Sequence, residues 1–90
     1  MLEFEWDKGN LDHIADHQVS ANEIEQIFRD PNRLEAKAYS VREEQRFATL
    51  GQTEAGRILT IIYTIRNGKI RTVTAYRATR KEQRRYQEGL

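Results

Sequence analysis

The stretch "YTIRNGKIRTVTAYRATRKEQRRY", residues 63–86, decides the fold of this chain. Asn67-Gly68 lies between two β-rich runs and favours a tight type I′ turn, because both central residues of that turn need a positive φ angle. Thr79 and Glu82 then form a capping box, a signal that starts a helix. The stretch therefore predicts a β-hairpin followed by a C-terminal helix.

A two-residue turn sets the pairing of the two flanking strands. Arg66 then faces Lys69 and Thr64 faces Arg71, and directly opposed residues share one face of a sheet. The same register, continued to the far end of the hairpin, places Arg77 opposite Ile58 on that face. The face that gathers the positive charges is therefore expected to carry Arg66, Lys69, Thr64, Arg71, Ile62, Val73 and Arg77.

Four of these residues, Arg66, Lys69, Arg71 and Arg77, form what we call the cationic strip. A guanidinium group binds two phosphate oxygens at once and keeps its charge near neutral pH. Such contacts position a nucleic-acid backbone without reading its sequence. The strip therefore predicts an anion-binding surface. The alternative is a solvated strand face whose cations discourage aggregation.

A strand and two helices are expected upstream. Segment 2–6, "LEFEW", alternates apolar and charged residues as a half-buried strand does. Two amphipathic helices follow, the first capped by Asp7 or Asn10 and the second by a Ser20–Glu23 capping box. Their apolar positions are Leu11, Ile14 and Ala15 in the first helix, and Ile24, Ile27 and Phe28 in the second, which ends before Pro31.

Segments 34–39, "LEAKAY", and 40–51, "SVREEQRFATLG", predict two further strands before the hairpin. Phe47 is expected to point into the core, which places Glu44 and Arg46 on the opposite face of the sheet. Short connections between the strands make the sheet antiparallel. The expected fold is α+β, with two N-terminal helices packed on one face of the sheet and a third helix at the C-terminus.

The composition describes one small domain over residues 1–90. It has no cysteine, no signal-peptide pattern and no apolar run long enough to span a membrane. A soluble protein of the cytoplasm is expected. Residues 1–56 carry a net charge of −6 and residues 57–90 a net charge of +7. This asymmetry predicts an anionic partner for the basic half, or else mutual neutralisation of the two halves within the fold.

His13 and His17 stand four residues apart on the first expected helix, a spacing that metal-binding histidines share. No third ligand stands at a matching spacing, so no metal site is predicted. A metal-dependent hydrolase built on this pair is the weaker alternative. The pair is also expected on the helical side of the sheet, which argues against a catalytic role.

The pattern "FEWD…N…H…VS..E…IF.DP", followed by "EEQRF…G" and "YTIR…IRTVTA.RATRKE…Y", resembles the BrnT toxins of bacterial type II toxin–antitoxin pairs. The resemblance extends from Phe4 to Tyr86. It implies a compact RelE-like fold, toxic ribonuclease activity and neutralisation by an antitoxin encoded alongside. The antitoxin of such pairs is typically a DNA-binding protein, and the complex represses its own promoter. No cofactor is expected.

By this resemblance the family's E-x-R-F motif falls on residues 44–47 and its Y-T-x-R motif on residues 63–66, while the basic start of the next strand falls on Arg71. Relatives usually carry Ser-Ala-Arg near the end of that strand. Here Tyr76 takes the place of the arginine and Arg77 follows it. Either the strand bulges locally, or a family arginine is missing and the activity is weakened. The second possibility suggests a non-catalytic RNA- or partner-binding module of the same fold.

Metal-independent RNA cleavage needs a base for the 2′-hydroxyl, positive charge around the developing phosphorane and a proton for the leaving oxygen. Arginines can supply the electrostatic part, usually the largest single contribution. Glu44 is the candidate base, and Tyr86 is the candidate acid if the final helix folds over the strip. The expected catalytic residues are Glu44, Arg46, Arg66, Arg77 and Tyr86, and the expected RNA contacts are Thr64, Lys69, Arg71, Arg80 and Lys81.

Overall fold

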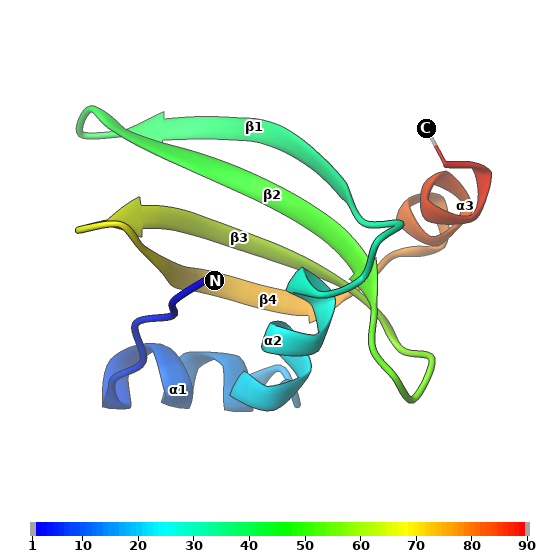
Figure 1. The fold of residues 1–90 in the computed structure, drawn as a ribbon, viewed down its shortest axis with the longest axis horizontal. Coiled ribbons are helices and arrows are strands. Elements are labelled where there is room, and N and C mark those ends of the chain that lie inside the picture. Colours follow the sequence, from blue (N-terminus) through cyan, green and yellow to red (C-terminus); the bar gives the residue numbers. More distant parts are fainter. Residues whose placement is uncertain (1, 90) are drawn as a thin grey trace.

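The two strands joined at Asn67-Gly68 belong to a four-stranded antiparallel sheet, with two helices before it and one after it (Figure 1). The computed structural model describes residues 2–89. The elements are α1 (Lys8–Asp16), α2 (Ala21–Phe28), β1 (Leu34–Val41), β2 (Glu44–Gln52), β3 (Ile58–Arg66), β4 (Lys69–Arg77) and α3 (Arg80–Glu88). The strand order is β1-β2-β3-β4. The expected α+β class, with two N-terminal helices and a C-terminal helix, is confirmed.

Local sequence signals set where the helices begin. Ser20 and Glu23 exchange side-chain and backbone hydrogen bonds at the start of α2, and an equivalent capping box at Thr79 starts α3. Both boxes agree with the prediction. At α1 the N-cap is Asp7, whose carboxylate accepts from the backbone N–H of Asn10 at 3.0 Å.

Within residues 2–89, no helix combines the length and apolarity needed to cross a membrane.

The core lies between the sheet and the two N-terminal helices, which cover the same face of the sheet (Figure 1). Phe28 of α2 meets Tyr63 of β3 edge-on, with ring centroids 5.0 Å apart, and Phe47 of β2 stacks on Tyr63 at 5.5 Å. Burying one large apolar side chain contributes about 1.5–3 kcal/mol, so this cluster holds α1 and α2 in place. Its buried members are Ile14, Val19, Ile24, Ile27, Phe28, Leu59, Ile61, Tyr63, Ile70 and Ala75.

The expectation of one strand over residues 40–51 is wrong. A tight turn at Arg42-Glu43 divides the segment between β1 and β2, and both turn residues have positive φ angles, 51° and 67°. Glycine and asparagine are the usual residues of such a turn. Since neither is present here, nothing local marks the turn.

The expectation of a strand over residues 2–6 is also wrong. Phe4 makes a single parallel bridge to Ile70 of β4, with two backbone hydrogen bonds of 2.8 Å on either side of it. The chain turns into α1 directly afterwards, at the N-cap Asp7. Pairing along β4 therefore stops after one bridge.

The β3–β4 hairpin keeps the expected register near its turn. Arg66 faces Lys69 and Thr64 faces Arg71. The two turn residues have φ angles of 52° and 75°, as a type I′ turn requires. The turn-proximal half of the hairpin is therefore as predicted.

A β-bulge at Val73 adds one residue to β4 relative to β3. Beyond the bulge Arg77 pairs with Leu59, on the face covered by the helices, rather than with Ile58. The expected place of Arg77 in the cationic strip is therefore wrong. The physical reason is that one extra residue in a strand moves every following side chain to the other face.

Candidate functional site

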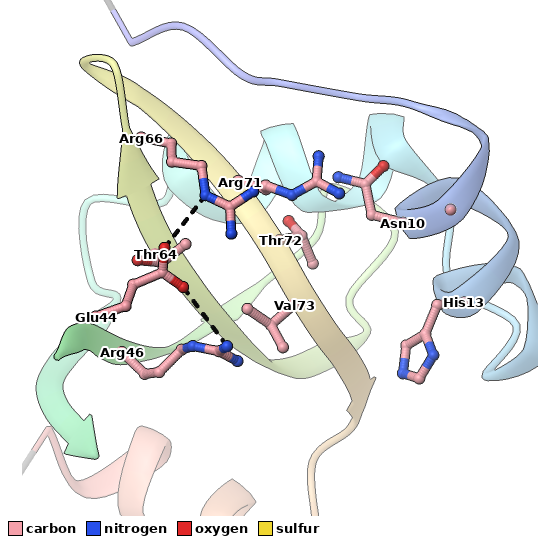
Figure 2. A pocket seen from close by; sticks show the side chains of 10 residues that line it. Asn10, His13, Glu44, Arg46, Thr64, Arg66, Arg71, Thr72 and Val73 are labelled. Carbon is pink, nitrogen blue, oxygen red and sulfur yellow. Dashed lines mark hydrogen bonds and ion pairs between the residues drawn. The ribbon is translucent and has the colours of Figure 1, made fainter. Parts of the chain in front are cut away.

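An open pocket of about 280 Å³ lies where the turn-proximal half of the sheet meets the start of α1. Strands β2, β3 and β4 supply its charged side chains, and α1 forms its opposite wall (Figure 2). The residues that line it are Gly9, Asn10, His13, Glu44, Arg46, Thr64, Arg66, Arg71, Thr72 and Val73.

The alternation of side chains along β2 delivers Glu44 and Arg46 to this pocket. Phe47 faces Tyr63 and stacks on it against the core. Neighbouring side chains of a strand point to opposite faces, so Glu44 and Arg46 meet Arg66 of β3 on the other face (Figure 2). The expected orientation of these side chains is confirmed.

Glu44 lies between two arginines. Its Oε2 accepts a hydrogen bond from Nε of Arg66 at 3.2 Å, and its Oε1 lies 3.5 Å from Nη2 of Arg46. The Arg46 side chain is only 17% exposed, and among the described residues its buried Nε finds no hydrogen-bond partner. A buried donor left unpaired costs about 1–3 kcal/mol, so a further oxygen acceptor is favoured at this point.

Arg71 and Thr64, both expected to contact RNA, are engaged within the chain. Arg71 donates to Glu5 at 3.0 Å and to Asp7 at 2.8 Å. This hydrogen bond from Arg71, followed by that from the Asn10 backbone, holds the pKa of Asp7 below its usual range. The Thr64 side chain is buried, and its hydroxyl donates to a backbone carbonyl of β2 at 2.9 Å. The pocket arginines therefore carry their own counter-ions.

The four members of the cationic strip do not share one surface. Arg66, Lys69 and Arg71 lie together at the turn end of the hairpin, and Lys69 is exposed there. Arg77 lies at the far end of β4 on the opposite face. The strip is thus reduced to three residues, joined by Arg46 from β2.

Tyr86 lies outside the pocket. Its hydroxyl donates to Oδ2 of Asp30 at 2.5 Å, near the C-terminal end of α2. Burial, followed by this hydrogen bond, raises the pKa of Tyr86 to about 12. α3 contacts β2 and does not fold over the strip, so it does not bring Tyr86 to Arg66. Arg80 and Lys81 are exposed in the first turn of α3.

Tyr76, the departure from the family pattern, is placed by the bulge. It pairs with Thr60 and therefore points to the same face as Arg66. Its hydroxyl donates to Glu82 of α3 at 3.0 Å, and burial followed by this carboxylate raises the pKa of Tyr76. A local bulge is present, as the first alternative expected, but it turns Arg77 away from the face of Arg66 and brings no arginine to that place. The second alternative, a missing family arginine, therefore stays open. The side chain at position 76 points to the same face as Arg66, where an arginine could join the pocket. Tyr76 instead holds α3 through its hydrogen bond to Glu82.

His13 was expected on the helical side of the sheet, yet it lines the pocket (Figure 2). Its Nε2 lies 3.0 Å from Oγ1 of Thr74, a contact between residues 61 positions apart for which no local signal exists. The His17 ring lies 5.5 Å away and outside the pocket lining. Over residues 2–89, no group of three or more His, Cys, Asp or Glu side chains is arranged to hold a metal ion.

A family model described as "Ribonuclease toxin, BrnT, of type II toxin-antitoxin system" matches residues 6–82. The match includes every residue that lines the pocket. No curated protein matches the chain.

Proposed function

The chain belongs to the BrnT family of ribonuclease toxins of type II toxin–antitoxin systems, and from this premise we propose that it cleaves RNA at the pocket around Glu44, Arg46 and Arg66. Membership of the family implies an RNA substrate and an antitoxin partner. One observation carries the choice of pocket. A single carboxylate is held between two arginines, and one of them has a buried Nε without a partner among the described residues.

The Glu44 carboxylate occupies the place that a phosphate group of the RNA takes. Both groups are anions whose oxygens accept from guanidinium donors. A phosphate offers more oxygens than a carboxylate does, so it can stay bonded to Arg66 and also accept from Nε of Arg46. Substrate binding then releases Glu44 and leaves two positive side chains on the scissile phosphate.

In the proposed reaction, the 2′-hydroxyl oxygen attacks the adjacent phosphorus and the P–O5′ bond breaks. Glu44 accepts the proton of the 2′-hydroxyl once it is released from the arginines. Arg46 and Arg66 stabilise the negative charge that develops on the phosphorane oxygens. The products are a 2′,3′-cyclic phosphate and a 5′-hydroxyl, and no step requires a metal ion.

Cations around the pocket extend the contact to neighbouring phosphates. Lys69 is exposed beside Arg66, whereas Arg71 is neutralised by Glu5 and Asp7 and ties the N-terminal segment to β4. Arg80 and Lys81 offer a more distant contact on α3. Such phosphate contacts position the backbone without selecting a sequence.

In this proposal, three further residues predicted for the site neither contact RNA nor take part in catalysis. Thr64 orients the β2–β3 pair through its hydrogen bond instead of binding RNA directly. Arg77 has no role at the pocket because the bulge sends it to the other face. Tyr86 has none because its hydroxyl is bonded to Asp30.

We also propose that the antitoxin inactivates this toxin by covering the pocket. An acidic segment of the antitoxin takes the place of the RNA phosphates on Arg46 and Arg66. The antitoxin is a DNA-binding protein, and the complex represses the promoter of the pair. A chain without cysteine suits the reducing cytoplasm, where we place both proteins.

The proposal is tested by in vitro cleavage of RNA in the presence of EDTA. Arg66→Ala is expected to reduce kcat about 10²–10³-fold, the loss typical of one donor to a developing oxyanion. Arg29→Ala is the matched control, because Arg29 is an exposed arginine paired with Glu54 at 3.8 Å on another surface. End-group analysis should find 2′,3′-cyclic phosphates.

Three results would contradict the proposal. One is full activity of Arg66→Ala, and another is loss of wild-type activity with the chelator. The third is RNA binding without cleavage by the wild-type chain. That outcome would favour a non-catalytic RNA-binding module of the same fold. The presence of Tyr76 where relatives carry an arginine suggests this alternative.

A further inference from the structure

We infer that His13 is the proton donor to the leaving 5′-oxygen in this ribonuclease. The inference rests on the proposed function, because it adds a second proton-transfer group to the same pocket. His13 lines that pocket from α1, across from Glu44 and Arg46 on β2 (Figure 2). It is exposed, so the fold does not depend on its burial.

The structure holds His13 in a defined position. Its Nε2 lies 3.0 Å from Oγ1 of Thr74, which the bulge at Val73 places next to α1. One turn earlier on α1, the buried Asn10 donates to the Glu5 carbonyl at 2.9 Å. Groups held in place before the reaction lose little further freedom when it occurs.

The start of α1 is also tied to the sheet. The N-cap Asp7 accepts from Arg71 of β4 at 2.8 Å. The helix that carries His13 is thereby fixed against the strand that carries Thr74. The imidazole is therefore set at the pocket before the RNA binds.

The proposed reaction still lacks a general acid. The leaving 5′-oxygen needs a proton, and an arginine does not release one near neutral pH. Glu44 is already assigned to the 2′-hydroxyl, and Tyr86 is bonded to Asp30 outside the pocket. Among the residues that line the pocket, His13 is the one with an imidazole side chain, the group most often used for general acid–base catalysis.

In this step one proton is accepted and one is donated, so the protons balance. Glu44 takes the proton of the 2′-hydroxyl as the new P–O2′ bond forms. The protonated imidazole of His13 gives one proton to O5′ as the P–O5′ bond breaks. With Thr74 accepting from Nε2, the Nδ1–H supplies that proton. Exchange with water then returns both groups to their starting states.

Several titratable and charged groups surround His13. The His17 ring lies 5.5 Å away on the same helix, and the Thr74 hydroxyl faces it from β4. Asp12 and Asp16 flank it on α1. The charged groups of the pocket are Glu44, Arg46, Arg66 and Arg71.

The test compares His13→Ala with His17→Ala, an exposed histidine one turn away and outside the pocket. His13→Ala is expected to lower kcat about 10²–10⁴-fold, the usual contribution of one acid or base, with little change in KM. The alkaline limb of the kcat profile, which reports the proton donor, should disappear. His17→Ala should keep the wild-type rate and profile, and thermal melts should show both variants folded.

A substrate with sulfur in place of the scissile 5′-oxygen makes the test specific. A thiolate leaves without a proton, so this RNA should restore His13→Ala to near the wild-type rate. It should not restore Glu44→Gln, which lacks the base.

Two results separate the inference from the proposed function. If Arg66→Ala is inactive while His13→Ala keeps the wild-type kcat and pH profile, the role of His13 is wrong and the proposed function stands. If the wild-type chain cleaves no RNA, the proposed function is wrong and the role of His13 with it.

Discussion

At the scale of single residues, Glu44 determines how much positive charge the pocket presents. It is 28% exposed and reaches both Arg46 and Arg66. Ion pairs of exposed side chains contribute only about 0–1 kcal/mol, and Arg66 is 50% exposed, so we expect its pair with Glu44 to be exchanged for a phosphate at little cost in free energy. The ion pairs therefore orient two guanidinium groups at the pocket where we propose that RNA binds.

Glu44→Gln removes this charge and keeps the volume of the side chain. RNA is expected to bind several-fold more tightly, because no anion competes for Arg46 and Arg66, while kcat falls about 10²–10⁴-fold with loss of the base. Anisotropy with a 2′-O-methyl RNA measures the binding, and single-turnover cleavage measures the rate. Glu54→Gln, on the surface pair with Arg29, is the control. Weaker RNA binding by Glu44→Gln would argue against the proposal that an RNA phosphate replaces the Glu44 carboxylate.

At the scale of elements, β4 serves two parts of the molecule because it is bulged. Its turn-proximal half carries Arg71 to the pocket, in the register that the turn imposes. Beyond Val73 each side chain of β4 points to the face opposite to the one that an unbulged strand would give it. Tyr76 therefore reaches α3, and Arg77 points away from the pocket. The bulge also sets Thr74 against His13. A straight strand would not provide both contacts.

The packing of α2 on β2 depends on Gly51. A Cβ atom at this position would lie 2.8 Å from Cγ2 of Ile27, so Gly51→Ala is expected to lower the free energy of unfolding by about 1–3 kcal/mol through overpacking. Gly9→Ala, in α1, is the comparison, because its Cβ would meet only Oδ1 of Asp7, at 3.3 Å, and alanine favours a helix by up to about 1 kcal/mol. Urea denaturation measures both variants. Unchanged stability of Gly51→Ala would mean that α2 shifts freely on the sheet.

At the scale of the whole molecule, α3 is attached mainly by polar contacts. None of its residues, 80–88, is buried. The Tyr86 hydroxyl donates to Asp30 at the end of α2, and the Tyr76 hydroxyl donates to Glu82 of α3. The helix is therefore held to both the sheet and the helical layer through phenol protons, and we expect its attachment to weaken at alkaline pH.

Tyr86→Phe is expected to lower the free energy of unfolding by about 0.5–1.5 kcal/mol at pH 8, the usual net contribution of one hydrogen bond. The pKa of Tyr86 is raised to about 12 in the folded chain, whereas an unfolded tyrosine releases its proton near pH 10. The contribution is therefore complete below pH 10 and is lost as the pH rises to about 12.

Urea denaturation of the wild type and Tyr86→Phe between pH 8 and pH 11 measures this difference. Tyr39→Phe is the control, because Tyr39 is 51% exposed on β1. A constant difference between the wild type and Tyr86→Phe across this range would show that the phenol proton of Tyr86 does not stabilise the fold.

Much of the candidate site follows from short-range rules. Alternation about Phe47 is enough to place Glu44 and Arg46 on one face, and the turn after Arg66 is enough to bring Arg71 beside it. The role of Tyr86 could not be judged in this way, because it depends on how α3 docks. The hydrogen bond to Asp30 joins residues 56 positions apart.

The sequence by itself determined the Asn67-Gly68 turn, the capping boxes at Ser20 and Thr79, and the α+β class, because each depends on backbone angles or spacings within a few residues. Tertiary structure alone decided the bulge at Val73, the unmarked turn at Arg42-Glu43, the neutralisation of Arg71 by Glu5 and Asp7, and the presence of His13 in the pocket. These features arise where segments far apart in the chain meet. Their positions are set by packing across the sheet, which no local pattern encodes.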